Sequence, residues 1–315
     1  MTPRQRLDLF RALGFLAPNL SGFLVFTSLP VLFSLGLSFF QWDTFSSPRF
    51  VGFDNFARLL SDPKLWFYLY NTLFLMLGLP LSMAGSLFLA VVLSQKLRGI
   101  IAYRTLFYLP TVTNGVALFL LWKWLYNPKY GLINSLLLPL LGLDTIDDLP
   151  NWLAGSTELG FLSWFGIETA SYWAKTAIIL MGVWASIGGG NMILYLAALA
   201  NVPEELYEAS EIDGAGKRQQ FWHITWPMIA PTTFFILVIS VISGLQGGFE
   251  IAYLMTSGGP GKDGDNTVTL GYYIYRAAFE NLEFGYAAAV SWFLFVLIFG
   301  LTLLNWRYGK GTVHY

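Results

Sequence analysis

The stretch Asn201–Pro227 reads NVPEELYEASEIDGAGKRQQFWHITWP, and it sets the organisation of the whole chain. This stretch is polar and rich in small residues, whereas the sequence on either side of it, over 176–203 and 224–249, carries no charged side chain. Apolar runs of that length are long enough to cross a hydrocarbon core of roughly 30 Å as helices. The sequence therefore predicts a polar hairpin that joins two membrane-spanning helices.

Within the hairpin, the residues predict two short helices with a turn between them. Asn201 is a suitable N-cap, Pro203 fits the first helical turn, and the acidic residues that follow suit the positive end of a helix. Asp213-Gly214 is typical of a turn. We expect the second helix over 217–223 and the start of the next span at Pro227.

Composition also places this chain in a membrane. Of 315 residues, 55% are hydrophobic and 12% are charged, whereas a soluble domain carries roughly 25% charged residues. The net charge of −1 gives no general attraction to nucleic acid, so we expect no nucleic-acid partner. The chain has no cysteine and two histidines, which excludes a disulfide framework, a thiol nucleophile and a multi-histidine metal centre.

Runs without charge predict six spans. A segment in lipid must satisfy its own backbone, so we expect an all-α, polytopic membrane protein that forms a single transmembrane domain over 1–315. The predicted spans cover residues 15–42, 66–95, 102–126, 172–200, 227–255 and 284–306. The apolar run 130–143 is short and contains Pro139, which favours an interfacial or re-entrant piece within an external loop over 127–171.

The distribution of Lys and Arg predicts the orientation of the spans. With a cytoplasmic N-terminus, the inner segments 1–14, 96–104, 204–223 and 307–315 carry ten Lys and Arg residues. The outer segments 43–64, 123–175 and 250–283 carry eight over about twice the length. Both termini and the hairpin are therefore predicted to be cytoplasmic.

The residues alone leave two interpretations of the hairpin open. One is an amphipathic connector that lies on lipid headgroups, and the other is a docking surface for a partner. Helices that lie on headgroups are usually basic, whereas the first helix here is acidic, which favours docking. Small side chains at the bend let a helix sit deep in a partner's groove.

The hairpin resembles the EAA loop of binding-protein-dependent ABC importer permeases, whose pattern is E-A-A, three residues, G, nine residues and I-x-L-P. This chain has Glu208-Ala209-Ser210, then Gly214, and then Ile224-Thr225-Trp226-Pro227 at the same spacing. Ser210 stands where the pattern has its second Ala, and Trp226 stands where it has Leu.

Three further segments resemble the sugar-permease branch of that family, which includes maltose, lactose and glycerol-phosphate permeases. They are Val51-Gly52-Phe53-Asp54-Asn55-Phe56, the stretch Phe249–Pro260 with its FExxYxxTxGGP spacing, and Phe284-Gly285-Tyr286-Ala287. Glu250 stands where that branch usually has Asp. Together these segments extend the resemblance over essentially the whole chain.

The resemblance implies what composition does not. The hairpin corresponds to the coupling helix that docks on an ATPase subunit, and the implied coupling residues are Glu208, Ala209, Ser210, Asp213, Gly214 and Ala215. The implied partners are a second related permease chain, forming a heterodimer, an ABC ATPase dimer and a solute-binding protein, in a bacterial inner membrane whose lipid also surrounds the chain. The implied cofactors, ATP and Mg²⁺, belong to the ATPase, and this chain binds none.

A translocation path requires polar groups inside the bundle. For each Ser, Thr or Asn, an interhelical hydrogen bond is the simpler explanation, but a set on two neighbouring spans favours a polar site. Runs of glycine within a span let helices approach closely or unwind. The candidate path residues are Trp184, Ser186, Gly190, Asn191, Ser243, Gln246, Glu250 and Asn114.

Glu250 has two possible places. A carboxylate at the bilayer centre costs roughly 2.5–3.5 kcal/mol on insertion scales, which marks a functional group. At the outer interface the cost disappears, and Glu250 is then a gate or a loop anchor. The residues leave both open.

No catalytic pattern is present, so we expect a transport subunit and not an enzyme. The chain lacks a G-x-x-x-x-G-K-[ST] loop, a G-x-S-x-G elbow and an H-E-x-x-H helix. The favoured function is the permease subunit of an ABC importer for a sugar or sugar-like solute. The alternatives are an ion-coupled secondary transporter that uses Glu250, for which inverted repeats are not evident, and a membrane scaffold.

Overall fold

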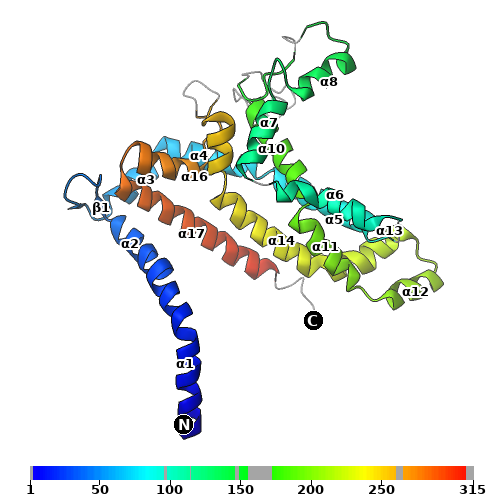
Figure 1. Cartoon of the computed structure of the whole chain (residues 1–315), viewed down its shortest axis with the longest axis horizontal. Coiled ribbons are helices and arrows are strands. Elements are labelled where there is room, and N and C mark those ends of the chain that lie inside the picture. Colours follow the sequence, from blue (N-terminus) through cyan, green and yellow to red (C-terminus); the bar gives the residue numbers. More distant parts are fainter. Residues whose placement is uncertain are drawn as a thin grey trace. The chain divides into compact units, whose positions relative to one another are not determined.

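The computed structural model describes residues 3–95, 98–113, 115–145, 149–154, 172–259 and 265–309 (Figure 1). These residues are mostly helical, and the only sheet among them is a pair of two-residue strands. In the labels used below, η denotes a π-helical turn. The expected all-α, polytopic fold is confirmed.

Five helices of the described chain are long and apolar enough to cross a membrane. They are Arg11–Leu37, Pro63–Leu93, Trp173–Ala200, Lys217–Gln246 and Phe284–Arg307. A sixth span is counted if α6 (Ile100–Val112) and α7 (Val116–Leu125), which are bent by 96° relative to each other, form one broken span. Asn114, a candidate path residue, lies between α6 and α7 and outside the described residues.

The chain divides into two compact units, and each is described by itself. The first unit comprises Met1–Asp62 and Ile274–Phe295. Its elements are α1 (Pro3–Phe23), η1 (Leu24–Ser28), α2 (Leu29–Leu37), β1 (Phe40–Gln41), β2 (Arg49–Phe50), α3 (Asp54–Ser61), η5 (Arg276–Glu280) and the first part of α17 (Phe284–Gly309).

A strand pair organises the first unit. The strands β1 and β2 are antiparallel, with Phe40 opposite Phe50. The amide of Asn55 donates hydrogen bonds to the carbonyl oxygens of Ser38 and Phe40, at 2.8 and 3.0 Å, and fastens α3 to the end of α2. Gly285 lies so close that a Cβ there would be 1.8 Å from the Phe40 carbonyl oxygen, so only glycine fits at the start of α17.

The second unit comprises Pro63–Tyr273 and Val296–Tyr315, and it contains the hairpin. The boundary between the units falls within α16 and again within α17. The remaining elements are α4 (Pro63–Leu75), α5 (Gly78–Leu93), α8 (Leu132–Leu141), α10 (Tyr172–Ile187), α11 (Gly190–Ala200), α12 (Glu204–Ile212), α13 (Lys217–Gln220), η3 (Phe221–Thr225), α14 (Trp226–Gln246), α15 (Phe249–Ile251), η4 (Ala252–Thr256) and α16 (Leu270–Tyr275).

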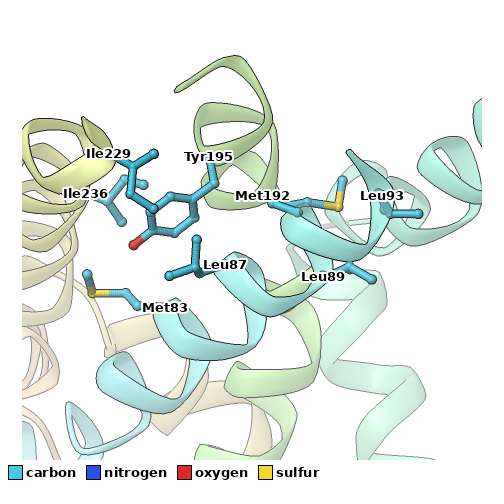
Figure 2. Packing of buried hydrophobic residues seen from close by; sticks show 9 residues of the cluster. Met83, Leu87, Leu89, Leu93, Met192, Tyr195, Ile229 and Ile236 are labelled. Carbon is cyan, nitrogen blue, oxygen red and sulfur yellow. The ribbon is translucent and has the colours of Figure 1, made fainter. Parts of the chain in front are cut away.

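The core of the second unit lies where α5, α11 and α14 meet. Figure 2 shows Tyr195 of α11 projecting between Leu87 of α5 and Ile229 of α14. Lipid chains are as apolar as these side chains, so close packing and not the hydrophobic effect holds the helices together. This core packs α11 and α14, the two helices that the hairpin joins, against α5.

Two helices end earlier than the uncharged runs indicate. The helix of the first span ends at Leu37, and the chain continues through Ser38 and Phe39 into β1. The helix α14 ends at Gln246 and not near residue 255, because Gly247 is extended and Gly248 has φ +91°, a left-handed conformation that interrupts the helix. Of the expected external loop 127–171, residues 146–148 and 155–171 lie outside the described chain.

Candidate functional site: the hairpin and the spans beside it

The hairpin forms two helices joined by a tight turn. The first is α12, and Gly214 in the turn has φ +79°, which favours glycine. The N–H of Ala215 donates to the carbonyl oxygen of Ser210 at 2.9 Å and closes the turn. Glu208, Ala209, Asp213 and Gly214 are exposed, so the bend presents four of its six implied coupling residues outward, whereas Ser210 and Ala215 are half-buried.

The start of α12 differs from the expectation. Asn201 was expected as the N-cap, but Pro203 occupies that position with φ −60° and ψ 130°, and no side chain caps the helix. The extended backbone that a cap requires comes from the proline itself. The acidic Glu204 and Glu205 in the first turn take the place of a capping side chain because they stabilise the positive helix end.

Three hydrogen bonds fasten α12 to the base of the next span. The hydroxyl groups of Tyr207 and Thr225 lie 2.8 Å apart, and Gln220 donates its amide to the Ser210 hydroxyl at 2.9 Å and to the Tyr207 carbonyl oxygen at 3.4 Å. Gln220 is 3% exposed and Thr225 is 6% exposed. Because these groups are buried and paired, they fix the position of α12 against the helix that carries Thr225.

That helix begins earlier than expected. Residues Lys217–Gln246 form one continuous helix, so Pro227 lies inside it and not at its start. The π-helical turn η3 ends at Thr225, two residues before Pro227, and such turns occur where the regular hydrogen-bond ladder is interrupted. The second short helix and the fifth span are therefore a single rod.

An ion pair closes the outer side of the turn. Lys217 lies 2.8 Å from the Glu211 carboxylate, and both side chains are exposed. This hydrogen bond from Lys217 is the main reason why the pKa of Glu211 lies below its ordinary value, and the Gln220 amide contributes. An exposed ion pair of this kind adds little to the stability of the fold, and its main effect is to hold the two sides of the turn together.

Two of the candidate path residues line one cavity among the spans. A cavity of about 220 Å³ lies between α4, α5, α10 and α14, and Ser186 and Ser243 face it from α10 and α14. Its polar rim also contains Thr72, Ser82 and Thr269. These three residues are not among those predicted from the sequence to line the path. Thr72 and Ser82 lie in the second uncharged run, where hydroxyl groups among apolar residues were an available signal.

A second cavity lies at the break between α10 and α11. It measures about 240 Å³ and is lined by Ser186, Gly190 and Asn191 together with Thr111 of α6. A Cβ on the neighbouring Gly188 would lie 1.8 Å from the Phe107 carbonyl oxygen. The glycine run therefore lets α6 contact the span formed by α10 and α11 directly, and this contact shapes the cavity.

The other candidates are not brought to these cavities. Trp184 packs edge-to-face on Trp122, with ring centroids 5.4 Å apart, and is 47% exposed. Gln246 is exposed at the last position of α14, and Glu250 is exposed in the short helix α15 after the glycine break. The break moves Glu250 off the continuous helix.

Lys175 belonged to the outer segment 123–175, but it is 2% exposed. Its ammonium lies over the rings of Phe67, Tyr70 and Phe74 of α4, at 5.7, 4.9 and 5.3 Å from the ring centres. The three rings follow helical spacing, which was a readable signal for one face of α4. They stabilise the buried cation.

Comparison with known proteins agrees with this arrangement. Residues 22–308 match the family described as "Binding-protein-dependent transport system inner membrane component". The probable ABC transporter permease protein YesP of Bacillus subtilis (strain 168) is 34% identical over 313 residues, 98% of this chain and 94% of YesP. The sn-glycerol-3-phosphate transport system permease protein UgpA of Pectobacterium atrosepticum is 35% identical over 272 residues, 85% of this chain and 83% of UgpA.

Two solved structures share the fold. A chain of a bacterial ABC transporter involved in the import of the acidic polysaccharide alginate superposes with a TM-score of 0.80 at 26% identity, covering 99% of this chain and 100% of that chain. A chain of a bacterial alginate ABC transporter in complex with an alginate pentasaccharide-bound periplasmic protein gives 0.76 at 26% identity, covering 96% and 93%. This multi-pass membrane protein therefore belongs to the family of inner membrane components of binding-protein-dependent transport systems.

Proposed function

We propose that this chain is the permease subunit of an ATP-driven importer and forms half of the translocation path for a sugar or sugar-like solute. The observation that carries the proposal is the hairpin, whose exposed α12 is hydrogen-bonded through Tyr207 and Gln220 to the rod Lys217–Gln246. A surface that projects from a bundle and is fastened to a span is suited to transmit a push from a partner into that span.

The class of solute is supported by the relatives. UgpA is named for sn-glycerol-3-phosphate transport, and the two similar structures are of transporters for alginate. All of these solutes carry several hydroxyl groups and negative charge. The cavity hydroxyls of this chain, such as those of Ser186 and Ser243, are suited to bind the hydroxyl groups of a saccharide.

The coupling step is assigned to the exposed bend. Glu208, Ala209, Ser210, Asp213, Gly214 and Ala215 would enter a groove on an ATPase subunit, to which Glu208 and Asp213 present exposed charges. The ATPase would bind ATP and Mg²⁺, and this chain would bind neither. Movement of α12 would then displace Thr225 and the whole of α14 with it.

The solute path is assigned to the two cavities that share Ser186. Ser243 lines the cavity of about 220 Å³, of which α14 forms one wall, and Gly190 and Asn191 line the cavity of about 240 Å³. A displacement of α14 through the hairpin therefore changes the cavity that holds Ser243. Trp184, Gln246, Glu250 and Asn114 remain proposals for path residues outside these cavities.

The assembly follows from the family. We assign a solute-binding protein and an ABC ATPase dimer as partners, together with a second, related permease chain that forms a heterodimer with this one. Both termini and the hairpin face the cytoplasm of a bacterial inner membrane. The binding protein then approaches from the opposite side of the membrane.

Cross-linking tests the coupling surface directly. The chain has no native cysteine, so Ala209→Cys and Asp213→Cys each introduce a single thiol on the exposed bend. In membranes with all subunits, both should form cross-links to the nucleotide-hydrolysing subunit, and Ser47→Cys on the opposite side of the predicted topology should not. Absence of any cross-link from both bend positions, with the complex intact, overturns the coupling role.

Uptake tests the source of energy. In vesicles that contain the assembled complex, solute uptake should require ATP on the hairpin side and the loaded binding protein on the other. It should continue when the proton gradient is dissipated. Uptake that follows the gradient and ignores ATP would favour the ion-coupled alternative with Glu250, which the family assignment argues against.

A further inference from the structure

Two cavities of the first unit share a wall, and neither is explained by transport. An apolar groove of about 420 Å³ is lined by Phe33, Gly36, Leu37, Phe40, Trp42 and Pro48. A polar cavity of about 590 Å³ lies beside it and also contains Trp42. Both volumes lie in the range of roughly 300–1,000 Å³ that small-molecule sites occupy.

The apolar groove lies where the first span leaves the membrane. Three of its residues, Phe33, Gly36 and Leu37, belong to the last turns of α2, which ends the apolar helix Arg11–Leu37. Trp42 follows directly, and tryptophan is enriched at membrane–water interfaces, where its ring meets both the apolar and the polar layer. The groove therefore opens at the depth of acyl chains near a bilayer surface.

Five charged side chains line the polar cavity, and three of them, Asp43, Arg58 and Glu283, have hydrogen-bond or ion-pair partners within the first unit. Asp43 accepts hydrogen bonds from the N–H and hydroxyl of Ser46 and the N–H of Phe45, and the Ser46 backbone bond is the main cause that holds its pKa below the ordinary value. Glu283 is bound by both terminal nitrogens of Arg58 at 2.9 Å.

The other two charged side chains of the polar cavity are Arg49 and Asp54. Both line the polar cavity and both are exposed, and in the described part of the chain neither forms an ion pair. A ligand that carries one negative and one positive group satisfies both. Neutral saccharides and peptides without charge leave both groups unmatched.

We propose that these two cavities together bind one phospholipid with a zwitterionic headgroup, of the phosphatidylethanolamine type. Arg49 binds the headgroup phosphate, Asp54 binds the ammonium group, and an acyl chain lies in the apolar groove past Trp42. An amphiphile is the occupant because the charged pair and the apolar groove are contiguous, and because lipid is present wherever a membrane span ends. The site fixes the strand pair β1 and β2 at the bilayer surface.

Lipid retention tests the proposal on the full chain with the subunits that co-purify. The complex, in detergent, is titrated with phosphatidylethanolamine or phosphatidylglycerol and the bound lipid is counted by native mass spectrometry. Gly36→Leu fills the groove, and Gly22→Leu on the same span is its control, since neither glycine has an atom within 4 Å of an added Cβ. Arg49→Gln removes the cation, and Arg98→Gln is its exposed control in the second unit.

The wild-type complex should retain phosphatidylethanolamine in preference to phosphatidylglycerol. Arg49→Gln should lower that retention about tenfold, as the loss of one charge-assisted contact does. Gly36→Leu should also lower it, because the leucine side chain occupies the groove, and both controls should leave it unchanged. Asp54→Asn should abolish the preference between the two lipids. Equal retention by Gly36→Leu, Arg49→Gln and their controls overturns the proposal whether or not the importer transports its solute.

A photo-cross-link separates lipid from the other possible occupants. With Phe33 replaced by p-benzoylphenylalanine in the assembled complex in native membranes, irradiation should add the mass of a lipid to this chain. A protein adduct, either to a second permease chain or to the binding protein, shows that the groove is a subunit interface and overturns the proposal.

Discussion

Because Gly188 is in close contact with the backbone of α6, we predict that Gly188→Ala lowers both stability and solute uptake. A Cβ at this position would lie 1.8 Å from the Phe107 carbonyl oxygen and 2.7 Å from its carbon. Ordinary contacts begin at 3.4 Å, so the two segments must separate by about 1.6 Å (3.4 − 1.8). The obstacle is backbone, which cannot rotate away as a side chain can.

Overpacking of a close contact lowers the free energy of unfolding by about 1–3 kcal/mol. Because the obstacle here is backbone, we expect Gly188→Ala to lie at the upper end of that range. Relative displacement of α6 and α10 also widens the cavity at the α10–α11 break, which contains Ser186 and Asn191. We therefore expect a melting temperature several degrees lower than wild type and reduced uptake.

Gly190→Ala is the matched control, since it lies two residues away and nothing lies within 4 Å of an added Cβ. Thermal unfolding of the detergent-solubilised complex, followed by tryptophan fluorescence, measures both variants. Equal melting temperatures for Gly188→Ala and Gly190→Ala would refute the close contact between α6 and the span formed by α10 and α11.

Three further predictions concern the hairpin and the path. Tyr207→Phe removes the hydrogen bond to Thr225 and about 0.5–1.5 kcal/mol of net stabilisation. Solute transported per ATP hydrolysed should fall, and an unchanged ratio in vesicles contradicts the role of this bond. Glu250→Ala should lower uptake while the subunits still co-purify, and wild-type uptake would remove Glu250 from the path. Because Lys217 holds the pKa of Glu211 below its ordinary 4.5, their contact stabilises the hairpin above pH 4.5 and is lost as the pH falls through the lower folded-state pKa. Glu211→Gln should remove this acid-side change in proteolytic cleavage of the hairpin, and an identical pH dependence in wild type and variant argues against the ion pair.

The membrane spans and the hairpin could be predicted from the sequence because their causes are local. A long uncharged run in lipid has to satisfy its backbone as a helix, and this requirement does not depend on its neighbours. The turn at Gly214 is equally local, since its left-handed backbone needs glycine. The spacing from Glu208 to Pro227 identified the family for the same reason, as it lies within one continuous segment.

Sequence patterns gave the wrong helix boundary at two positions and the wrong environment for one side chain. Asn201 is a good capping residue, but the φ of Pro203 already prepared the helix start two residues later. The end of the fifth span was misplaced because hydropathy does not register the left-handed backbone at Gly248. Lys175 interrupted an apolar run, and only its packing on the rings of α4 shows that it is buried.

The composition of the cavities was decided by tertiary structure alone. The sequence placed Ser186 and Ser243 on neighbouring spans, but whether two such hydroxyls meet depends on how each helix is rotated about its axis. That rotation is set by contacts between residues far apart in the chain, such as Gly188 against Phe107, and no local pattern encodes them. Hydropathy therefore determined which segments cross the membrane, and close packing of backbones determined which side chains face one another inside it.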